Sequence, residues 1–225
     1  RWKPHIFKGE EIDTYELGLK TPLAGNSVNL TAAVFYNDYR NVQITGHVTP
    51  AFQSQIALTV INAGSARTYG AEMGLNARVS PALTVGATAG YLNARYRDFR
   101  VVNNPVQANF DYTGQRMTNS PEWQLSFNAN LDQPISDSLK LVGNVLASHT
   151  SRIIWIQSGQ PTSINFPPFV TGFPNGGILP DSDQPGYWIV NARLGIASAD
   201  DRWELAVYAK NLFNEAYSTF GSSNA

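Results

Sequence analysis

Arginine and aromatic residues occur together in two segments of this 225-residue chain, and they are the side chains best suited to ligand binding. The segment 95–100 reads RYRDFR, and the segment 152–155 begins with arginine and ends with tryptophan. A guanidinium binds anionic groups through several N–H donors and also stacks on flat aromatic systems. We therefore predict a small-molecule site at Arg97, Phe99, Arg100, Arg116, Arg152 and Trp155. The alternative is that these charges only keep a loop soluble.

The sequence offers no set of residues for covalent or metal chemistry. The histidines His5, His47 and His149 are far apart and lack the spacing of metal ligands, and the chain has no cysteine. An ordinary role in loops or at a strand end accounts for all of them. We therefore predict no metal site, no cofactor and no catalytic residue.

Charged residues recur on the polar side of nearly every strand-like segment. Two carboxylates could act as the acid and the base of a glycoside hydrolase. However, one charge on the polar side of almost every strand is typical of a barrel with a water-filled interior. We predict that the following residues face such an interior: Glu16, Lys20, Glu72, Arg78, Glu122, Arg193, Glu204 and Lys210.

The segments that must position these residues show the alternation of strands with two different faces. In the segment 121–131, Trp123, Leu125 and Phe127 share one parity, while Gln124 and Ser126 share the other. Each segment has roughly the 9–11 residues that a tilted strand needs to cross a bilayer. Eight such segments are predicted, at 13–20, 28–37, 69–79, 83–91, 121–131, 139–149, 188–196 and 203–210.

The links between these segments alternate between short and long. Short links occur at 21–27, 80–81, 132–138 and 198–202, and long polar links at 41–67, 98–120 and 150–186. Outer-membrane barrels have this asymmetry, with short periplasmic turns and long extracellular loops. A soluble sandwich has no reason to collect its long loops at one end. The loop 150–186 is also long enough that a functional role is expected.

Large aromatic residues lie at the ends of the predicted strands, on the apolar parity. Amphipathic rings at strand ends are favoured at a membrane–water interface. Six of them adjoin the long links: Tyr15, Tyr36, Tyr69, Tyr91, Trp123 and Trp188. Trp203 occupies the opposite, short-turn end. We predict that these seven residues mark the two borders of the membrane, with lipid as the partner of the apolar face.

Composition limits the remaining classes. The formal net charge is −1 with no basic stripe, so nucleic acid is not an expected partner. No stretch approaches the roughly 18 consecutive apolar residues of a membrane helix. The chain starts at Arg1, without a methionine or an apolar leader. For an exported protein we therefore expect a processed chain or a fragment.

Several segments resemble, in order, the C-terminal part of the β-barrel of TonB-dependent outer-membrane receptors. The series is specific in combination and spans nearly the whole chain. The segments are YELGLK (15–20), LTAAVFYNDYRN (30–41), INAGSARTYGAEMGL (61–75), NSPEW (119–123), YWIVNARLGI (187–196) and WELAVYAKNLFNEAY (203–217).

The resemblance implies an all-β fold, in which residues 1–225 supply about eight antiparallel strands of a transmembrane barrel of roughly 22 strands. In this family the barrel encloses a plug that is displaced through TonB. Neither the plug nor the final strand is expected in this chain, which would form an open sheet. The implied partners are membrane lipid, the plug, the TonB complex and a small ligand such as an iron chelate. Some of the interior charges are expected to contact the plug.

We therefore interpret the chain as part of an outer-membrane receptor of Gram-negative type, not an enzyme. Its expected role is energy-coupled uptake of a scarce nutrient, with a ferric siderophore as the first choice. Cobalamin, saccharides and other solutes stay open. One alternative is a complete eight-stranded outer-membrane barrel with a structural or binding role. Another is a soluble β-sandwich that binds carbohydrate.

Overall fold

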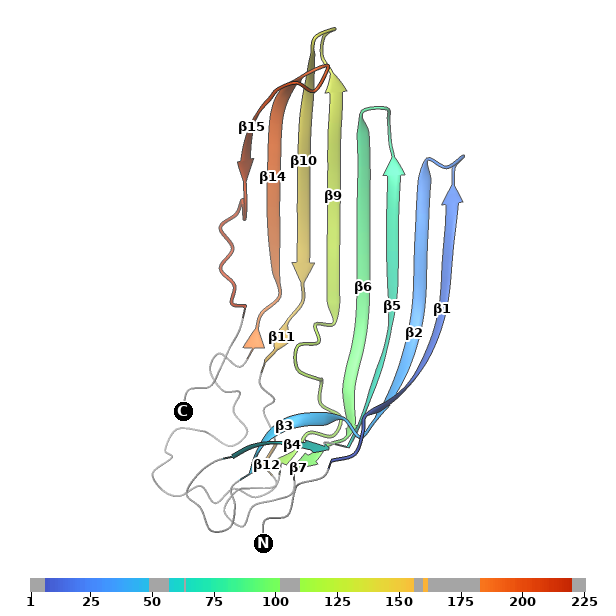
Figure 1. Cartoon of the computed structure of the whole chain (residues 1–225), viewed down its shortest axis with the longest axis vertical. Coiled ribbons are helices and arrows are strands. Elements are labelled where there is room, and N and C mark those ends of the chain that lie inside the picture. Colours follow the sequence, from blue (N-terminus) through green and yellow to red (C-terminus); the bar gives the residue numbers. More distant parts are fainter. Residues whose placement is uncertain are drawn as a thin grey trace.

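The computed structural model describes residues 7–48, 57–62, 64–101, 110–155, 160–161 and 183–219. Its main feature is one antiparallel sheet of eight long strands, in the order β1-β2-β5-β6-β9-β10-β14-β15 (Figure 1). The strands are β1 (Glu11–Leu23), β2 (Val28–Arg40), β5 (Ser65–Arg78), β6 (Leu83–Asp98), β9 (Trp123–Pro134), β10 (Leu139–Thr150), β14 (Tyr187–Ser198) and β15 (Glu204–Ala209).

All eight predicted strands are confirmed, and each pairs with its sequence neighbours in the sheet. Several strands are longer than predicted, and the largest difference is at the end of β6. The sequence placed 95–98 in a loop, but β6 continues through Asp98 and pairs with β5 up to Ser65. The arginines in this extension broke the alternation of apolar residues, although the backbone ladder does not require an apolar face. Arg95 and Arg97 therefore lie on a strand.

Seven shorter strands lie at the long-loop end, and the sequence did not predict them. They are β3 (Gln43–Val48), β4 (Ala57–Asn62), β7 (Arg100–Val101), β8 (Phe110–Asp111), β11 (Ile153–Ile154), β12 (Gln160–Pro161) and β13 (Asp183–Gln184). The strands β3 and β4 form a six-residue antiparallel ribbon. The strands β12, β8 and β7 form a small sheet, and β11 pairs with β13. The described part of the loop end therefore contains several short paired segments.

The main sheet has an apolar face and a polar face. The apolar face carries large side chains that are half exposed or more, such as Leu17 (74%), Leu205 (77%) and Val207 (75%). Across the described residues only six apolar side chains are buried, and most of these lie near the loop end. A sheet with so much uncovered apolar surface needs an apolar environment. The apolar face thus has the chemistry of a lipid-facing wall.

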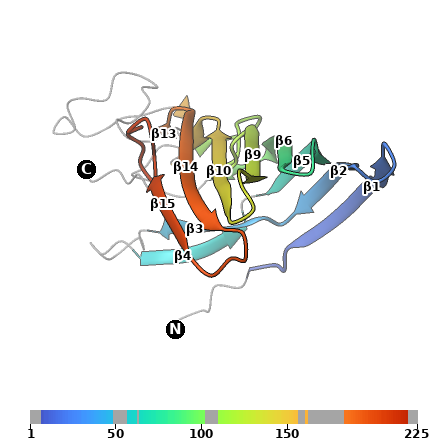
Figure 2. The ribbon, with the colours of Figure 1, turned by 90° about the horizontal axis from the view of Figure 1, so that it is seen from above.

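The sheet is bent into an arc, with β1 and β15 at its two ends (Figure 2). Within the described part of the chain, β1 pairs only with β2, and β15 only with β14. A closed barrel of eight strands would need pairing between β1 and β15. A sandwich would need a second sheet over the apolar face. The described residues show neither arrangement, so both alternatives fail on the fold.

The short turns connect strands at the end opposite the loops. Between β1 and β2, Ala24, Gly25 and Asn26 all have positive φ (49°, 63° and 73°). Positive φ at a two-strand turn matches the right-handed twist of the strands. Between β5 and β6, the Ser80 hydroxyl accepts hydrogen bonds from the amides of Ala82 (3.2 Å) and Leu83 (3.1 Å). Local chemistry therefore fixes the register of these hairpins.

Asparagines form a polar ladder across the polar face. The Asn144 amide donates to Asn130 Oδ1 at 2.6 Å, and Asn130 donates to Asn128 Oδ1 at 3.3 Å. Gly86 lies in register between Asn76 and Asn128. A Cβ at this glycine would come within 2.5 Å of Asn128 Nδ2, so its absence leaves room for both side chains. The middle of the polar face is thus lined largely by neutral polar side chains.

Among the described residues, no helix has the length and hydropathy needed to cross a membrane.

The pairing of β14 with β15 should be sensitive to one methyl group. A Cβ at Gly195 would lie 2.7 Å from Ala206 Cβ and 2.8 Å from the Leu205 carbonyl oxygen. We expect Gly195→Ala to lower the free energy of unfolding of the intact receptor by about 1–3 kcal/mol, because overpacking at backbone is hard to relieve. Urea unfolding in detergent measures it.

Gly90→Ala is the matched control. Its nearest atom would be the Gln124 carbonyl oxygen at 3.9 Å, which is an ordinary contact. This variant should change the unfolding free energy by no more than about 0.5 kcal/mol. Equal effects of the two substitutions would contradict the close packing inferred at Gly195.

Candidate functional site

A small apolar cluster holds the loop end together. This loop core comprises Val42, Ala66, Tyr96 and Phe99, all buried, with Tyr39, Tyr112 and Met117 packed against it. Tyr39, Ala66 and Tyr96 are register neighbours on β2, β5 and β6, so three strand extensions supply its base. Ring centroids lie 4.7 Å apart for Tyr96–Phe99 and 4.8 Å apart for Phe99–Tyr112. Burial raises the pKa of Tyr112.

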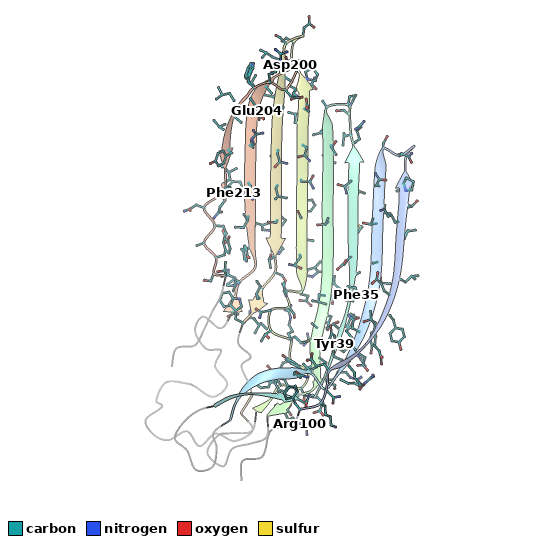
Figure 3. The ribbon with its side chains drawn as sticks, in the orientation of Figure 1. Phe35, Tyr39, Arg100, Asp200, Glu204 and Phe213 are labelled. Atoms are coloured by element: carbon teal, nitrogen blue, oxygen red, sulfur yellow. The ribbon has the colours of Figure 1, made fainter. Side chains whose placement is uncertain are left out.

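The loop core lies on the same face of β2, β5 and β6 that carries polar residues in the membrane-spanning part of these strands. In the spanning part of β2, β5 and β6, this parity carries residues such as Thr31, Glu72 and Thr88. Beyond Phe35 it becomes aromatic, and Figure 3 shows Tyr39 and Arg100 together at this end. The switch from polar to aromatic residues on one face indicates where the polar wall ends and the packed loop region begins.

Phe99, which the sequence placed among the ligand-binding residues, is 3% exposed. Its backbone N–H donates to Thr113 Oγ1 at 3.3 Å, and its carbonyl accepts from the Tyr112 amide at 2.8 Å. In this structure Phe99 joins the end of β6 to β8 rather than facing solvent. A role in ligand contact stays a prediction, and packing is the role that these contacts show.

The predicted arginines are paired with carboxylates. Arg97 lies 3.5 Å from Asp38 on β2, and Arg116 lies 3.5 Å from Glu122. Arg100 lies 3.8 Å from Asp98 and 3.5 Å from Asp111, its register partner on β8. Hydrogen bonds from Thr113 hold the pKa of Asp111 below its usual value, and the nearby Arg100 adds to this effect. These pairs fix the arginines without using all five guanidinium donors.

Arg152 and Trp155 flank β11, on the other long loop. Arg152 is ion-paired with Asp183 on β13, and the Trp155 side chain is partly exposed. The Asn119 amide donates to the Ile154 carbonyl at 2.8 Å, which joins this loop to the segment that follows Arg116. The structure therefore places the two predicted groups on the same rim. The pairing of β12 with β8, the strand next to Arg100, joins the same two loops.

The predicted interface aromatics lie in rows on the apolar face. Tyr15, Tyr36 and Tyr69 are register neighbours on β1, β2 and β5. Tyr91 and Trp123 are in register on β6 and β9, with ring centroids 4.9 Å apart. Exposed fractions are 66% for Tyr15, 43% for Tyr69, 46% for Trp123, 43% for Trp188 and, at the short-turn end, 51% for Trp203.

His149 belongs to the aromatic rows. It stacks on Trp188 with centroids 4.9 Å apart, and its Nδ1 lies 2.8 Å from the Tyr187 carbonyl oxygen. In the part of the chain that the structure describes, no group of three or more His, Cys, Asp or Glu residues could hold a metal ion. His5 lies outside the described residues, and His47 lies on β3.

Charges on the polar face concentrate at the short-turn end. Arg193 lies 2.5 Å from Glu204, and Figure 3 shows Glu204 and Asp200 at this end of the sheet. Sequence reasoning missed Lys140, which lies 3.0 Å from Asp132 and 2.7 Å from Asp201. Its alternation with Leu139 and Leu141 was the available signal. A pocket of about 420 Å³ lies at this end of the polar face. The charged residues that line it are Arg78, Asp132, Lys140, Arg193, Asp201 and Glu204.

The other predicted interior charges are less clustered. Glu16 and Lys20 lie on β1 opposite Phe35 and Thr31, and Glu72 lies on β5 opposite Ala33 and Gly90. Glu122 and Lys210 lie one residue outside β9 and β15, respectively. The register places Glu16, Lys20 and Glu72 on the polar parity of the sheet. Contact with water in a barrel interior or with another domain stays a prediction.

Comparison with known proteins gives a consistent family. The family of TonB dependent receptor-like β-barrels matches residues 5–212. The probable TonB-dependent siderophore receptor PiuA of Acinetobacter baumannii is 27% identical over 120 residues, which is 50% of this chain and 14% of PiuA.

Solved structures agree at the level of the fold. The ferric yersiniabactin uptake receptor FyuA of Yersinia pestis gives a TM-score of 0.66 at 20% identity, over 97% of this chain and 27% of FyuA. The structure of PiuA gives 0.62 at 20% identity, over 94% of this chain and 26% of PiuA. The copper transporter OprC gives a TM-score of 0.59 at 12% identity, over 95% of this chain and 27% of OprC. The chain thus spans about a quarter of these structures.

The packing role of Phe99 can be separated from ligand contact. We expect Phe99→Ala in the intact receptor to increase amide hydrogen exchange at Val42, Ala66 and Tyr96 by at least tenfold, because the loop core loses its central ring. Exchange within β9 should not change. Phe213→Ala, at a side chain that is 72% exposed, is the control and should leave both regions unchanged. Unaltered exchange in the Phe99 variant would contradict the packing role.

Proposed function

The chain belongs to the TonB-dependent receptor-like β-barrel family, and from this premise we propose that it forms one wall of a receptor that takes up a ferric siderophore. Members of this family are transport receptors of the Gram-negative outer membrane, so the chain is an outer-membrane protein. Energy-coupled uptake of a scarce nutrient, rather than catalysis, is the activity that we assign to it.

The observation that carries this proposal is the uncovered apolar face of a single sheet. Aromatic side chains border this face at the loop end, and Trp203 borders it at the turn end. We assign these seven residues to the two membrane interfaces, where rings with a polar edge are favoured. The long loops then lie outside the cell, and the short turns face the periplasm.

The guanidinium groups at the loop rim are positively charged hydrogen-bond donors that suit an anionic chelate. Arg100 is 64% exposed at its side chain and Arg152 is 47% exposed, so part of each guanidinium reaches solvent. A carboxylate partner already fixes each head group, which reduces the entropy lost when a ligand binds. We propose that Arg97, Arg100, Arg116, Arg152 and Trp155 contribute to capture, with Phe99 supporting them from the loop core.

The polar face is the surface that we assign to the plug. Its charged pocket at the turn end contains Arg78, Lys140 and Arg193 together with Asp132, Asp201 and Glu204. A surface with both signs of charge, near the periplasm, suits a domain that must be held reversibly. TonB would act on this chain only through that plug. Glu16, Lys20, Glu72, Glu122 and Lys210 are further candidates for the same contact.

Ferric siderophores are our first choice of ligand because PiuA is described as a siderophore receptor and FyuA as a ferric yersiniabactin uptake receptor. The cationic rim agrees with an anionic chelate. The similar fold of the copper transporter OprC shows that the fold alone does not select the ligand. The direct test is equilibrium binding of one ferric catecholate and one ferric hydroxamate chelate to the intact receptor. Absence of binding by both would contradict a siderophore function.

The membrane position of the apolar face can be tested at adjacent residues of β6. Ala87 lies on the apolar parity between Leu75 and Phe127, and Thr88 lies on the polar parity between Gly74 and Ser126. We expect Ala87→Arg to reduce stability in the membrane by about 2–4 kcal/mol, since arginine near the midplane is costly. Thr88→Arg should cost far less. The yield of heat-modifiable receptor measures both, and equal yields would contradict this orientation.

The cationic rim can be tested by truncating one arginine. We expect Arg100→Ala to weaken binding of an anionic ferric chelate by roughly ten- to a hundredfold, since a hydrogen bond to a charged group contributes about 1.5–3 kcal/mol. The control is Arg202→Ala at the turn end, where Arg202 is 84% exposed and paired with Asp200. Equilibrium binding to whole cells measures both variants. If they retain equal affinity, Arg100 takes no part in capture.

A further inference from the structure

Three arginines lie on the apolar parity of β5 and β6, just beyond the aromatic rows. Arg67 and Arg95 are direct register partners, and they follow the Tyr69–Asn93 pair by two residues. Two residues correspond to about 7 Å along a strand. The head-group layer of a bilayer is roughly 5–8 Å thick on each side. With Tyr69 at the interface, Arg67 and Arg95 therefore lie at the level of the lipid head groups.

The carboxylates around these positions neutralise their positive charge only in part. Neither Arg67 nor Arg95 forms an ion pair with another described residue, and Arg97 has Asp38 at 3.5 Å. Arg95 donates only to a neutral acceptor, the Gly114 carbonyl oxygen, at 2.9 Å. Nearby, Arg40 pairs with two carboxylates, Glu11 and Asp13, and Arg116 pairs with Glu122, so these five residues carry a net charge of −1. The three arginines share one carboxylate, that of Asp38, which is the register neighbour of Arg67, and the whole group keeps a net charge of +1.

The direct opposition of two arginines is unfavourable without an anion, because like charges in register destabilise a sheet. The Arg67 guanidinium is nevertheless held in place, with Cζ 5.3 Å from the centre of the Tyr36 ring. Its Nε is buried and has no hydrogen-bond partner among the described residues. A guanidinium that is positioned but incompletely paired is suited to an incoming phosphate oxygen.

An apolar groove of about 610 Å³ lies on the same face, toward the membrane centre. Small residues on β5 and β6, Ala71 and Ala89, lie between the larger Leu17, Met73, Tyr91 and Trp123. Ala71 follows Tyr69 by two residues on the same strand as Arg67. The groove is therefore placed where the acyl chain of a lipid would continue below its head group.

We propose that this face binds a membrane lipid with an anionic phosphate head group, with the phosphate at Arg67, Arg95 and Arg97 and an acyl chain in the alanine-lined groove. Arg97 also belongs to the proposed capture rim, whereas Arg67, Arg95 and the groove do not. The lipid site rests on the membrane position of the aromatic rows and on no property of the nutrient.

The test uses the intact receptor, including its plug, in maltoside micelles. Dioleoyl phosphatidic acid and dioleoyl phosphatidylcholine are titrated separately, and native mass spectrometry counts the bound lipids. We expect phosphatidic acid to bind at least tenfold more tightly than phosphatidylcholine. The double variant Arg67→Gln/Arg95→Gln should raise the apparent Kd for phosphatidic acid roughly ten- to a hundredfold. It should leave the Kd for phosphatidylcholine unchanged.

Two controls separate this lipid site from a general effect of surface charge and from a site for free anions. Arg202→Gln removes an exposed arginine at the opposite rim and should leave lipid binding unchanged. Inorganic phosphate at millimolar concentration should not compete, because it lacks the acyl chain. Binding of the ferric chelate should be the same in the wild type and the double variant, which distinguishes failure of this proposal from failure of the uptake function.

Unchanged phosphatidic acid binding in the double variant would overturn the proposal. Competition by inorganic phosphate would also overturn it and would indicate a site for free anions. If the glutamine variant loses its heat-modifiable mobility, Arg67→Lys/Arg95→Lys replaces it. This variant keeps the charge but loses the bidentate geometry, so a severalfold weaker affinity is expected. Unchanged affinity in the lysine variant would likewise refute the site.

Discussion

An unpaired backbone N–H or C=O group costs several kcal/mol in hydrocarbon, and this cost is the constraint on which the rest of the structure depends. It explains why the chain crosses the membrane as long antiparallel strands that exchange hydrogen bonds along their full length. It also explains the two faces, since a paired strand can place lipid-compatible side chains on one side and asparagines on the other. β1 and β15 have one described partner each, and such edges are stable in a membrane only when paired.

The loop end follows from the same strands. β2, β5 and β6 continue beyond the aromatic rows, where water can satisfy the backbone and the faces are free to change chemistry. One face then becomes the base of the loop core at Tyr39, Ala66 and Tyr96. The other carries Arg67 and Arg95, which we propose to lie at head-group level. Arg97, Arg100 and Arg152 pair with carboxylates on β2, β8 and β13, so the proposed capture surface is anchored on paired strands.

The sequence predicted what is local and missed what depends on contacts between distant segments. Period-2 alternation located all eight long strands, because each strand repeats the same contrast between lipid and water. It did not extend β6 to Asp98, where both faces become polar or aromatic. It placed Phe99 with the ligand-binding residues, but burial of that ring depends on β2, β5 and β8 meeting it. The carboxylate partners of the arginines and the Lys140–Asp132–Asp201 group are also formed between separate strands.

The central claim is that the apolar parity faces lipid and the polar parity faces water. This chain contains no cysteine. Single cysteines introduced at positions 124 to 131 can therefore carry spin labels along β9, with no native cysteine in residues 1–225 to be labelled as well. Accessibility to oxygen and to a water-soluble nickel complex is then measured in the intact receptor in bilayers. The structure predicts alternation with a period of two, with oxygen favoured at Leu125, Phe127 and Ala129 and nickel at Gln124, Ser126 and Asn128. No alternation, or alternation in the opposite phase, would contradict the account.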